Sequence, residues 1–158
     1  MNTLPRFLCD EMLGRLCRYL RAAGYDVLLA RDGASDAELL RQCHDEGRHF
    51  LTQDTLIREH KAARGIALIL PHVPLDELAA LVDTRFHLDW LSHAFTRCLV
   101  DNTSLVAADD AALARAPLDA RQHDEPLRCC PACGRVYWRG SHYKRMRAKL
   151  KAWQKIQT

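Results

Sequence analysis

Through the first ninety residues, short apolar runs alternate with segments whose apolar side chains recur at helical spacing. The segment from about Glu11 to Ala23 has this spacing, and Gly24 follows it as a residue that commonly ends helices. Farther on, Ser35 with Glu38 three positions later predicts a capping box at the start of another helix. Repeated strand–helix alternation is typical of a parallel sheet between layers of helices, so the sequence predicts a three-layer α/β domain.

The expected elements follow from where the apolar runs and their breaks fall. Strands are expected over residues 6–9, 25–29, 49–52 and 66–70. Helices are expected over residues 11–23, 35–46, 54–63, 75–82 and, near the end of the chain, 143–156.

The alternation ends after about ninety residues, and the charge of the chain changes at the same place. Residues 1–90 carry 11 Lys and Arg against 14 Asp and Glu, whereas residues 91–158 carry 12 against 6. Nine Lys and Arg follow Glu125 and no acid does, with Tyr and Trp interleaved among them. Such a segment suits a polyanionic partner, and a solvated surface is the alternative. We expect two domains, over residues 1–92 and 93–158.

Two of the apolar runs lead into an aspartate that opens a helical stretch, at Asp10 and at Asp54. In a parallel α/β sheet ligands bind at the carboxyl ends of the strands, and Asp36 and Glu38 are expected at this same edge. Carboxylates crowded together repel each other unless a cation lies between them. We therefore predict a site for Mg²⁺ or Mn²⁺ at Asp10, Asp36 and Asp54, with Glu38 as a secondary candidate. Simple helix capping by Asp10 and Asp54 is the alternative.

A threonine and two further aspartates lie near these acids in the sequence. Thr52 precedes Asp54 by two positions and shares its side of the strand, so its hydroxyl is a candidate to orient a carboxylate or a metal-bound water. An ordinary β-branched strand residue is the alternative for Thr52. The other acids near the ends of strands, Asp26 and Asp32, are expected to be surface or loop residues.

Arginines recur every third residue in the first helical segment, at Arg15, Arg18 and Arg21. Guanidinium groups suit bidentate contacts with phosphate. Arg15 lies nearest the expected acidic edge and is the strongest candidate, followed by Arg18, while Arg21 is too far along the helix. A solvated helix face is the alternative.

The cysteines of the last third resemble the ligands of a structural zinc site. Cys130 and Cys133 form a CxxC knuckle followed by glycine, and the partner knuckle has Cys98 with Asp101 where a second cysteine is expected. Three thiolates and one carboxylate are an unusual but workable zinc set. The other candidates for the fourth ligand are Cys129 and His142, and a site without metal is also consistent with the sequence.

Several strings are specific enough to indicate a family. The two longest are Asp10-Glu11-Met12-Leu13-Gly14-Arg15-Leu16 and Cys133-Gly134-Arg135-Val136-Tyr137-Trp138-Arg139-Gly140-Ser141-His142. Shorter ones include Asp36-Ala37-Glu38-Leu39, Leu51-Thr52-Gln53-Asp54 and Arg97-Cys98-Leu99-Val100. Together they resemble the Mut7-C RNase domain family over nearly the whole chain.

The resemblance implies a PIN-like nuclease domain followed by a zinc-ribbon-like domain. It also implies a ribonuclease whose acidic cluster, at Asp10, Asp36 and Asp54, binds Mg²⁺ or Mn²⁺. PIN-type sites commonly hold four acids, and the fourth is not assigned by the sequence. Asp101 departs from the family pattern, which typically has a cysteine there.

The leading hypothesis is a metal-dependent endoribonuclease that hydrolyses RNA phosphodiester bonds. The residues expected to contact RNA are Arg15, Arg18, Arg135, Arg139, Lys144 and Arg145. The alternative is a non-catalytic RNA-binding module associated with ribosomes or tRNA. No apolar stretch approaches the roughly 20 residues of a membrane helix, and the N-terminus has no signal-peptide segment, so we expect a cytoplasmic protein without a membrane partner.

Overall fold

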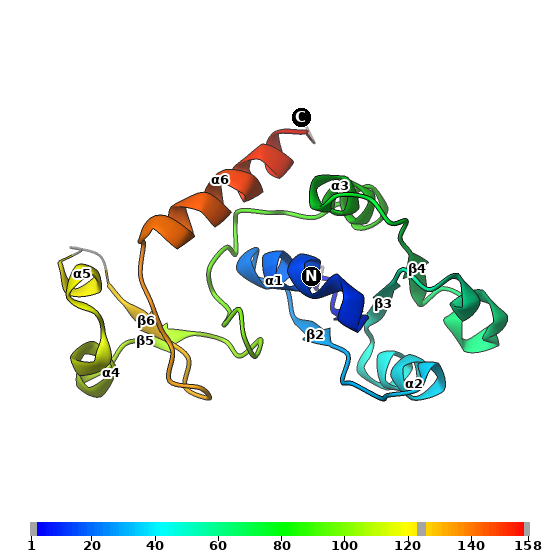
Figure 1. The fold of residues 1–158 in the computed structure, drawn as a ribbon, viewed down its shortest axis with the longest axis horizontal. Helices are drawn as coiled ribbons and strands as arrows, with labels where there is room; N and C mark the ends of the chain where they lie inside the picture. The colour runs from blue at the N-terminus through cyan, green and yellow to red at the C-terminus, as the bar shows by residue number, and fades with distance from the viewer. Residues whose placement is uncertain (1–2, 123–125, 157–158) are drawn as a thin grey trace. The chain divides into compact units, whose positions relative to one another are not determined.

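The structure, a computed structural model, describes residues 3–122 and 126–156. The chain divides into two compact units, and Figure 1 shows their elements. The first unit comprises residues 1–20 and 25–88, and the second comprises residues 21–24 and 89–158. No helix in the described stretches is long and apolar enough to cross a membrane.

The first unit is built on a parallel sheet of four short strands (Figure 1). The strands are β1 (Phe7–Cys9), β2 (Val27–Leu29), β3 (His49–Thr52) and β4 (Ala67–Ile69), in the spatial order β2-β1-β3-β4. The helices that connect or follow them are α1 (Gly14–Ala22), α2 (Asp36–Glu46) and α3 (Leu75–Phe86). All neighbouring strands pair in parallel, which confirms the predicted α/β fold.

Successive strand residues point to opposite sides of this sheet, and each side packs against a different helix. Leu8 pairs in register with Phe50, and both lie in a buried cluster with side chains of α2. One position earlier, Phe7 and His49 pair with each other and both meet Phe86 of α3, with ring centroids 5.1 and 4.6 Å apart. The first unit therefore has three layers.

Two expected helices take a different form. The first begins as a 3₁₀ turn, η1 (Glu11–Leu13), before α1 starts. The helix expected over residues 54–63 is instead two 3₁₀ helices, η2 (Thr55–Glu59) and η3 (Lys61–Ala63), separated by extended backbone at His60. Few side chains of that segment are buried, so it lacks the continuous apolar face that stabilises a longer helix.

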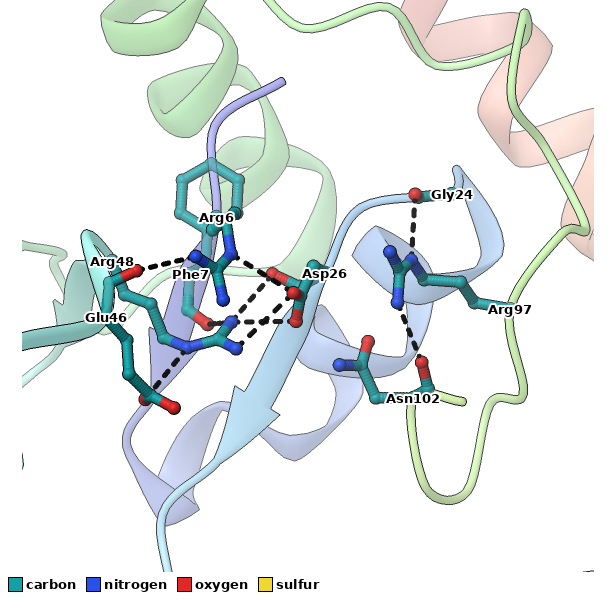
Figure 2. A network of polar contacts seen from close by, with 8 residues as sticks. All are labelled: Arg6, Phe7, Gly24, Asp26, Glu46, Arg48, Arg97 and Asn102. Carbon is teal, nitrogen blue, oxygen red and sulfur yellow. Dashed lines mark hydrogen bonds and ion pairs between the residues drawn. The ribbon is translucent and has the colours of Figure 1, made fainter. Parts of the chain in front are cut away.

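A group of ion pairs joins the amino ends of three strands (Figure 2). Arg48, directly before β3, is buried and places Nη1 2.7 Å from Oδ1 of Asp26, which precedes β2. Arg6, directly before β1, places Nε 3.2 Å from Oδ2 of the same carboxylate. Asp26 lies in the loop before β2, as expected, but its side chain is a largely buried ion-pair partner and not a surface acid. The sequence did not predict this because the arginines come from distant parts of the chain.

The second unit contains a small antiparallel sheet and a long C-terminal helix. The strands are β5 (Val106–Ala107), β6 (Arg128–Cys129) and β7 (Val136–Tyr137), paired in that order. The helices are α4 (Asp110–Arg115), α5 (Leu118–Arg121) and α6 (Ser141–Ile156). Trp153 of α6 packs against the buried Trp90 with ring centroids 4.8 Å apart, which anchors α6.

Residues 21–24 belong to this second unit through close backbone packing. Gly24 has a φ of +97°, and a Cβ there would collide with the backbone oxygen of His93. Arg97 donates to the backbone oxygens of Gly24 and Asn102 at 3.2 and 3.0 Å (Figure 2). Gly24 is thus required for this close approach as well as for ending the helix.

Candidate functional site

The carboxyl ends of the parallel strands border an open cleft of about 840 Å³. Asp10 follows β1, Asp54 follows β3 and Asp36 is the first residue of α2, and all three line this cleft. Three acids that are far apart in the sequence therefore share one cavity, as expected for a parallel sheet whose ligands bind at the strand ends.

Asp10 and Asp54 are connected through the hydroxyl of Thr52. Thr52 Oγ1 donates to Asp10 Oδ2 at 2.9 Å and accepts from the backbone N–H of Asp54 at 3.1 Å. Thr52 is fully buried, so this hydroxyl has a fixed position between the two acids. The predicted role of Thr52 in orienting a carboxylate requires such a contact with Asp10, and the role itself stays a prediction.

Both aspartates also cap the helices that follow them. Asp10 Oδ1 accepts from the N–H of Glu11 at 2.8 Å, and Asp54 Oδ1 accepts from the N–H of Leu56 at 2.9 Å. Each cap occupies one carboxylate oxygen. Within the described residues, Oδ2 of Asp54 has no hydrogen-bond partner, so capping leaves it available to a ligand in the cleft.

The acids of α2 have separate roles. Asp36, which lines the cleft, places its Oδ2 3.8 Å from Nε2 of His60. Glu38 accepts from the N–H of Ser35 at 3.0 Å and completes the predicted capping box. Because Glu38 is exposed and does not line the cleft, the structure places it with the cap and apart from the three aspartates.

The three aspartates line the cleft without crowding together. Across residues 3–122 and 126–156, no three His, Cys, Asp or Glu side chains at this cleft bring ligand atoms within 4.8 Å of one another. An ion that keeps several water ligands, as Mg²⁺ usually does, does not require every carboxylate in direct contact. A shared cation at Asp10, Asp36 and Asp54 stays a prediction.

Sequence reasoning missed a second acidic pair at the same edge. A hydrogen bond with Asp32, together with the charge of that carboxylate, raises the pKa of Glu11 above its usual value. Glu11 lines the cleft beside Asp10 and is therefore a candidate for the unassigned fourth acid. The position of Glu11 directly after Asp10 was an available indication, whereas the approach of Asp32 depends on a loop.

Basic side chains at the cleft also differ from those singled out in the sequence. Arg31 and Arg58 line the cleft, while Arg15 and Arg18 are exposed on α1 and are not among the lining residues. Arg21 is buried and donates to the backbone oxygens of Leu99 and Val100 at 3.1 and 3.0 Å. It therefore holds the backbone beside Cys98 in the second unit.

The second unit gathers four potential metal ligands. Cys98, Asp101, Cys130 and Cys133 each offer one ligand atom, and these atoms all lie within 4.8 Å of one another. The sulfurs of Cys98 and Cys133 are 3.8 Å apart, close to the separation of about 3.8 Å expected for thiolates around a tetrahedral zinc with 2.3 Å bonds. The donor set fits one metal ion, and neither Cys129 nor His142 belongs to it.

The two knuckles have the same local geometry, which explains why Asp101 stands among the cysteines. In one, the N–H of Gly134 donates to the oxygen of Cys130 at 2.9 Å, and Gly134 has a φ of +79°. In the other, the N–H of Asn102 donates to the oxygen of Cys98 at 3.0 Å, and Asn102 has a φ of +73°. Asp101 therefore occupies the position that corresponds to Cys133.

Groups around the cluster fix the charge and direction of its ligands. The N–H of Thr103 donates to Asp101 Oδ1 at 3.0 Å and lowers the pKa of Asp101, which favours its carboxylate form. The hydroxyl of Tyr137 lies 3.1 Å from Cys98 Sγ and accepts from the N–H of Leu99 at 3.0 Å. Burial raises the pKa of Tyr137, so its hydroxyl stays protonated and can donate a hydrogen bond to Cys98 Sγ.

Comparison with known families identifies the chain. The family model of the Mut7-C RNAse domain matches residues 5–150. The chain belongs to the Mut7-C RNAse domain family. This confirms the resemblance noted in the sequence. A comparison with curated proteins found no match.

Membership in the Mut7-C RNAse domain family indicates a ribonuclease-type function and an RNA substrate. The residues expected to contact RNA in the second unit, Arg135, Arg139, Lys144 and Arg145, are all exposed. Arg139 also lies over the ring of Tyr143, 5.5 Å from its centroid. These four cations are therefore accessible to a polyanion.

Proposed function

We propose that this protein is a metal-dependent endoribonuclease with a PIN-like catalytic unit. The supporting observation is that Asp10, Asp36 and Asp54 line one cleft and that the buried Thr52 hydroxyl joins two of them. A bound Mg²⁺ or Mn²⁺ would activate a water and neutralise charge on the scissile phosphate.

The chain's own residues would supply the rest of the site. Thr52 would hold Asp10, which lines the cleft, in one orientation through its 2.9 Å hydrogen bond. Arg31 and Arg58 line the same cleft and carry the forked donors that suit phosphate oxygens. The site would thus bind the RNA backbone beside the acids.

We further propose that the second unit is zinc-ribbon-like and that Cys98, Asp101, Cys130 and Cys133 hold structural Zn²⁺. The mutual closeness of their four ligand atoms supports this assignment. Free thiols kept as metal ligands are typical of a reducing compartment, which supports a cytoplasmic location.

The decisive experiment compares Asp10→Asn and Asp54→Asn with the wild-type protein in cleavage of RNA with added Mn²⁺. Both variants should lose cleavage while binding RNA as tightly as the wild type, because each removes a charge from the cleft without changing its shape. Glu77→Gln, at an exposed acid in the first turn of α3, is the matched control. Cleavage that persists in both aspartate variants would refute the assignment.

A non-catalytic RNA-binding module is the second candidate, favoured by the spacing of the three carboxylates. Among the described residues, these three carboxylates do not form a group whose ligand atoms all lie within 4.8 Å of one another. The two candidates differ in one readout, because a binding module leaves RNA uncut at every Mn²⁺ concentration.

A further inference from the structure

The helix α6 presents a row of lysines on the side opposite its anchor. It has 16 residues and is therefore about 24 Å long. Its buried residues are Met146, Leu150 and Trp153. The exposed Lys144, Lys151 and Lys155 are spaced seven and four residues apart, which places them within about 40° of one another on the opposite face. We name these three residues the lysine row.

The charge of α6 is not balanced within the helix. The helix contains six Lys and Arg residues and no Asp or Glu. Arg147 with Lys151, and Lys151 with Lys155, are like-charged pairs four residues apart, a spacing at which like charges destabilise a helix. A polyanion bound along the row would relieve this repulsion. The charge of α6 is therefore complementary to that of a phosphate backbone.

Aromatic residues near α6 are engaged in packing. Tyr143 packs on Phe95 with ring centroids 4.3 Å apart, and Trp153 is buried against Trp90. Every Phe, Tyr and Trp side chain of the chain lies in the described part, and each is buried or half-buried. Proteins that bind unstacked bases of single-stranded RNA usually offer exposed aromatic rings, and this surface offers cations and alanines.

We propose that α6 binds the phosphate backbone of double-helical RNA through the lysine row, without contacts that read unstacked bases. The inference rests on the proposed RNA-directed function and names its substrate class as structured RNA. A protein can recognise a duplex by charge and shape with cationic side chains on a rigid element, and it does not require exposed aromatic rings for this.

The test measures binding of a fluorescent RNA hairpin and of an unstructured RNA of equal length by anisotropy over a series of salt concentrations. No Mg²⁺ or Mn²⁺ is added, so that the RNA stays intact, and chelators are omitted to preserve metal at the cysteine cluster. The proteins are the wild-type chain, the triple variant Lys144→Gln/Lys151→Gln/Lys155→Gln, and the same triple with arginine. The control Arg41→Gln/Lys61→Gln/Arg64→Gln removes equal charge from exposed positions of the first unit.

The wild type should bind the hairpin more tightly than the unstructured RNA. The glutamine triple should lose about 10-fold or more in hairpin affinity, and its salt slope should fall by about 2 to 3 because three phosphate contacts are removed. The arginine triple and the control should stay close to wild type. A preference for unstructured RNA, or equal losses in the control and the lysine-row variant, would each overturn the proposal.

Failure of this inference is separable from failure of the proposed function. If the glutamine triple binds RNA normally while Asp10→Asn stops cleavage, only the role of α6 is wrong. If Asp10→Asn cleaves normally while the glutamine triple loses hairpin binding, α6 is the RNA contact and the catalytic assignment is wrong.

Discussion

The hydroxyl of Thr52 donates a hydrogen bond of 2.9 Å to Oδ2 of Asp10. Because Oγ1 of Thr52 also accepts from the N–H of Asp54, one buried hydroxyl fixes the ends of two neighbouring parallel strands. This arrangement joins stability and the proposed chemistry, because the acids that would face the substrate are positioned by a hydrogen bond inside the sheet.

Replacing Thr52→Val keeps the branched shape and removes the hydroxyl. We expect cleavage of RNA with Mn²⁺ to fall by about 10- to 100-fold through misplacement of Asp10. The unfolding free energy should fall by about 1–3 kcal/mol, because the N–H of Asp54 loses its acceptor. Initial cleavage rates and urea unfolding measure the two effects. Thr52→Ser retains the hydroxyl and should stay near wild type, and a fully active Thr52→Val would show that the hydroxyl does not position the site.

Asp101 is expected to be required for metal in the second unit. Asp101→Ala removes one of four ligands and should lower the zinc content well below one ion per chain, measured by elemental analysis after dialysis. Asp101→Cys should keep one ion and retain it against higher chelator concentrations. Asp119→Asn, an exposed acid of the same unit, is the control. Full zinc content in Asp101→Ala would place the fourth ligand elsewhere.

The ion pair between Arg48 and Asp26 predicts a large effect on stability. Arg48→Met leaves the mostly buried Asp26 carboxylate with only Arg6 as its charged partner in these ion pairs, and should cost about 3 kcal/mol of unfolding free energy. The exposed Arg41→Met should change it by less than about 0.5 kcal/mol. In the double variant with Asp26→Asn, the loss should be smaller than the sum of the single losses. Additive losses would mean that the pair contributes no coupling.

The sequence predicted interactions between residues that lie close together in the chain better than interactions between distant residues. The capping box of Ser35 and Glu38 was predicted because both partners lie within one helical turn. The candidate ligand Asp101 was found because two knuckles repeat one spacing. The Asp26–Arg48 pair was missed because its partners are 22 residues apart and meet only when β2 and β3 flank β1.

The same distinction explains the errors in secondary structure and at the cleft. Residues 54–63 have helix-forming composition, yet only Ile57 and Ala63 of η2 and η3 are buried, so packing does not support a full helix. Asp32 is an exposed loop acid, as expected, but the sequence did not predict its approach to Glu11, which is set by the path of that loop. Short-range patterns therefore predicted the strands of the first unit, α6 and the place of the three aspartates after strands or at a helix start. The short elements between residues 106 and 137, and partners brought together by loops, needed the structure.

His49 predicts how stability depends on pH. Burial and the charge of Arg85 lower its pKa from 6.5, so the folded chain keeps it neutral where the unfolded chain takes up a proton. As pH falls below about 6.5, the unfolded state therefore binds more protons and the unfolding free energy decreases, by at most about 1.4 kcal/mol per pH unit from this group. His49→Phe keeps a ring beside Phe7 and Phe86 and removes the titration. Urea unfolding between about pH 6.5 and 5 measures this effect. The unfolding free energy should fall less steeply in His49→Phe than in the wild type or in the exposed control His44→Gln. Parallel curves for all three proteins would mean that His49 contributes nothing to the acid sensitivity.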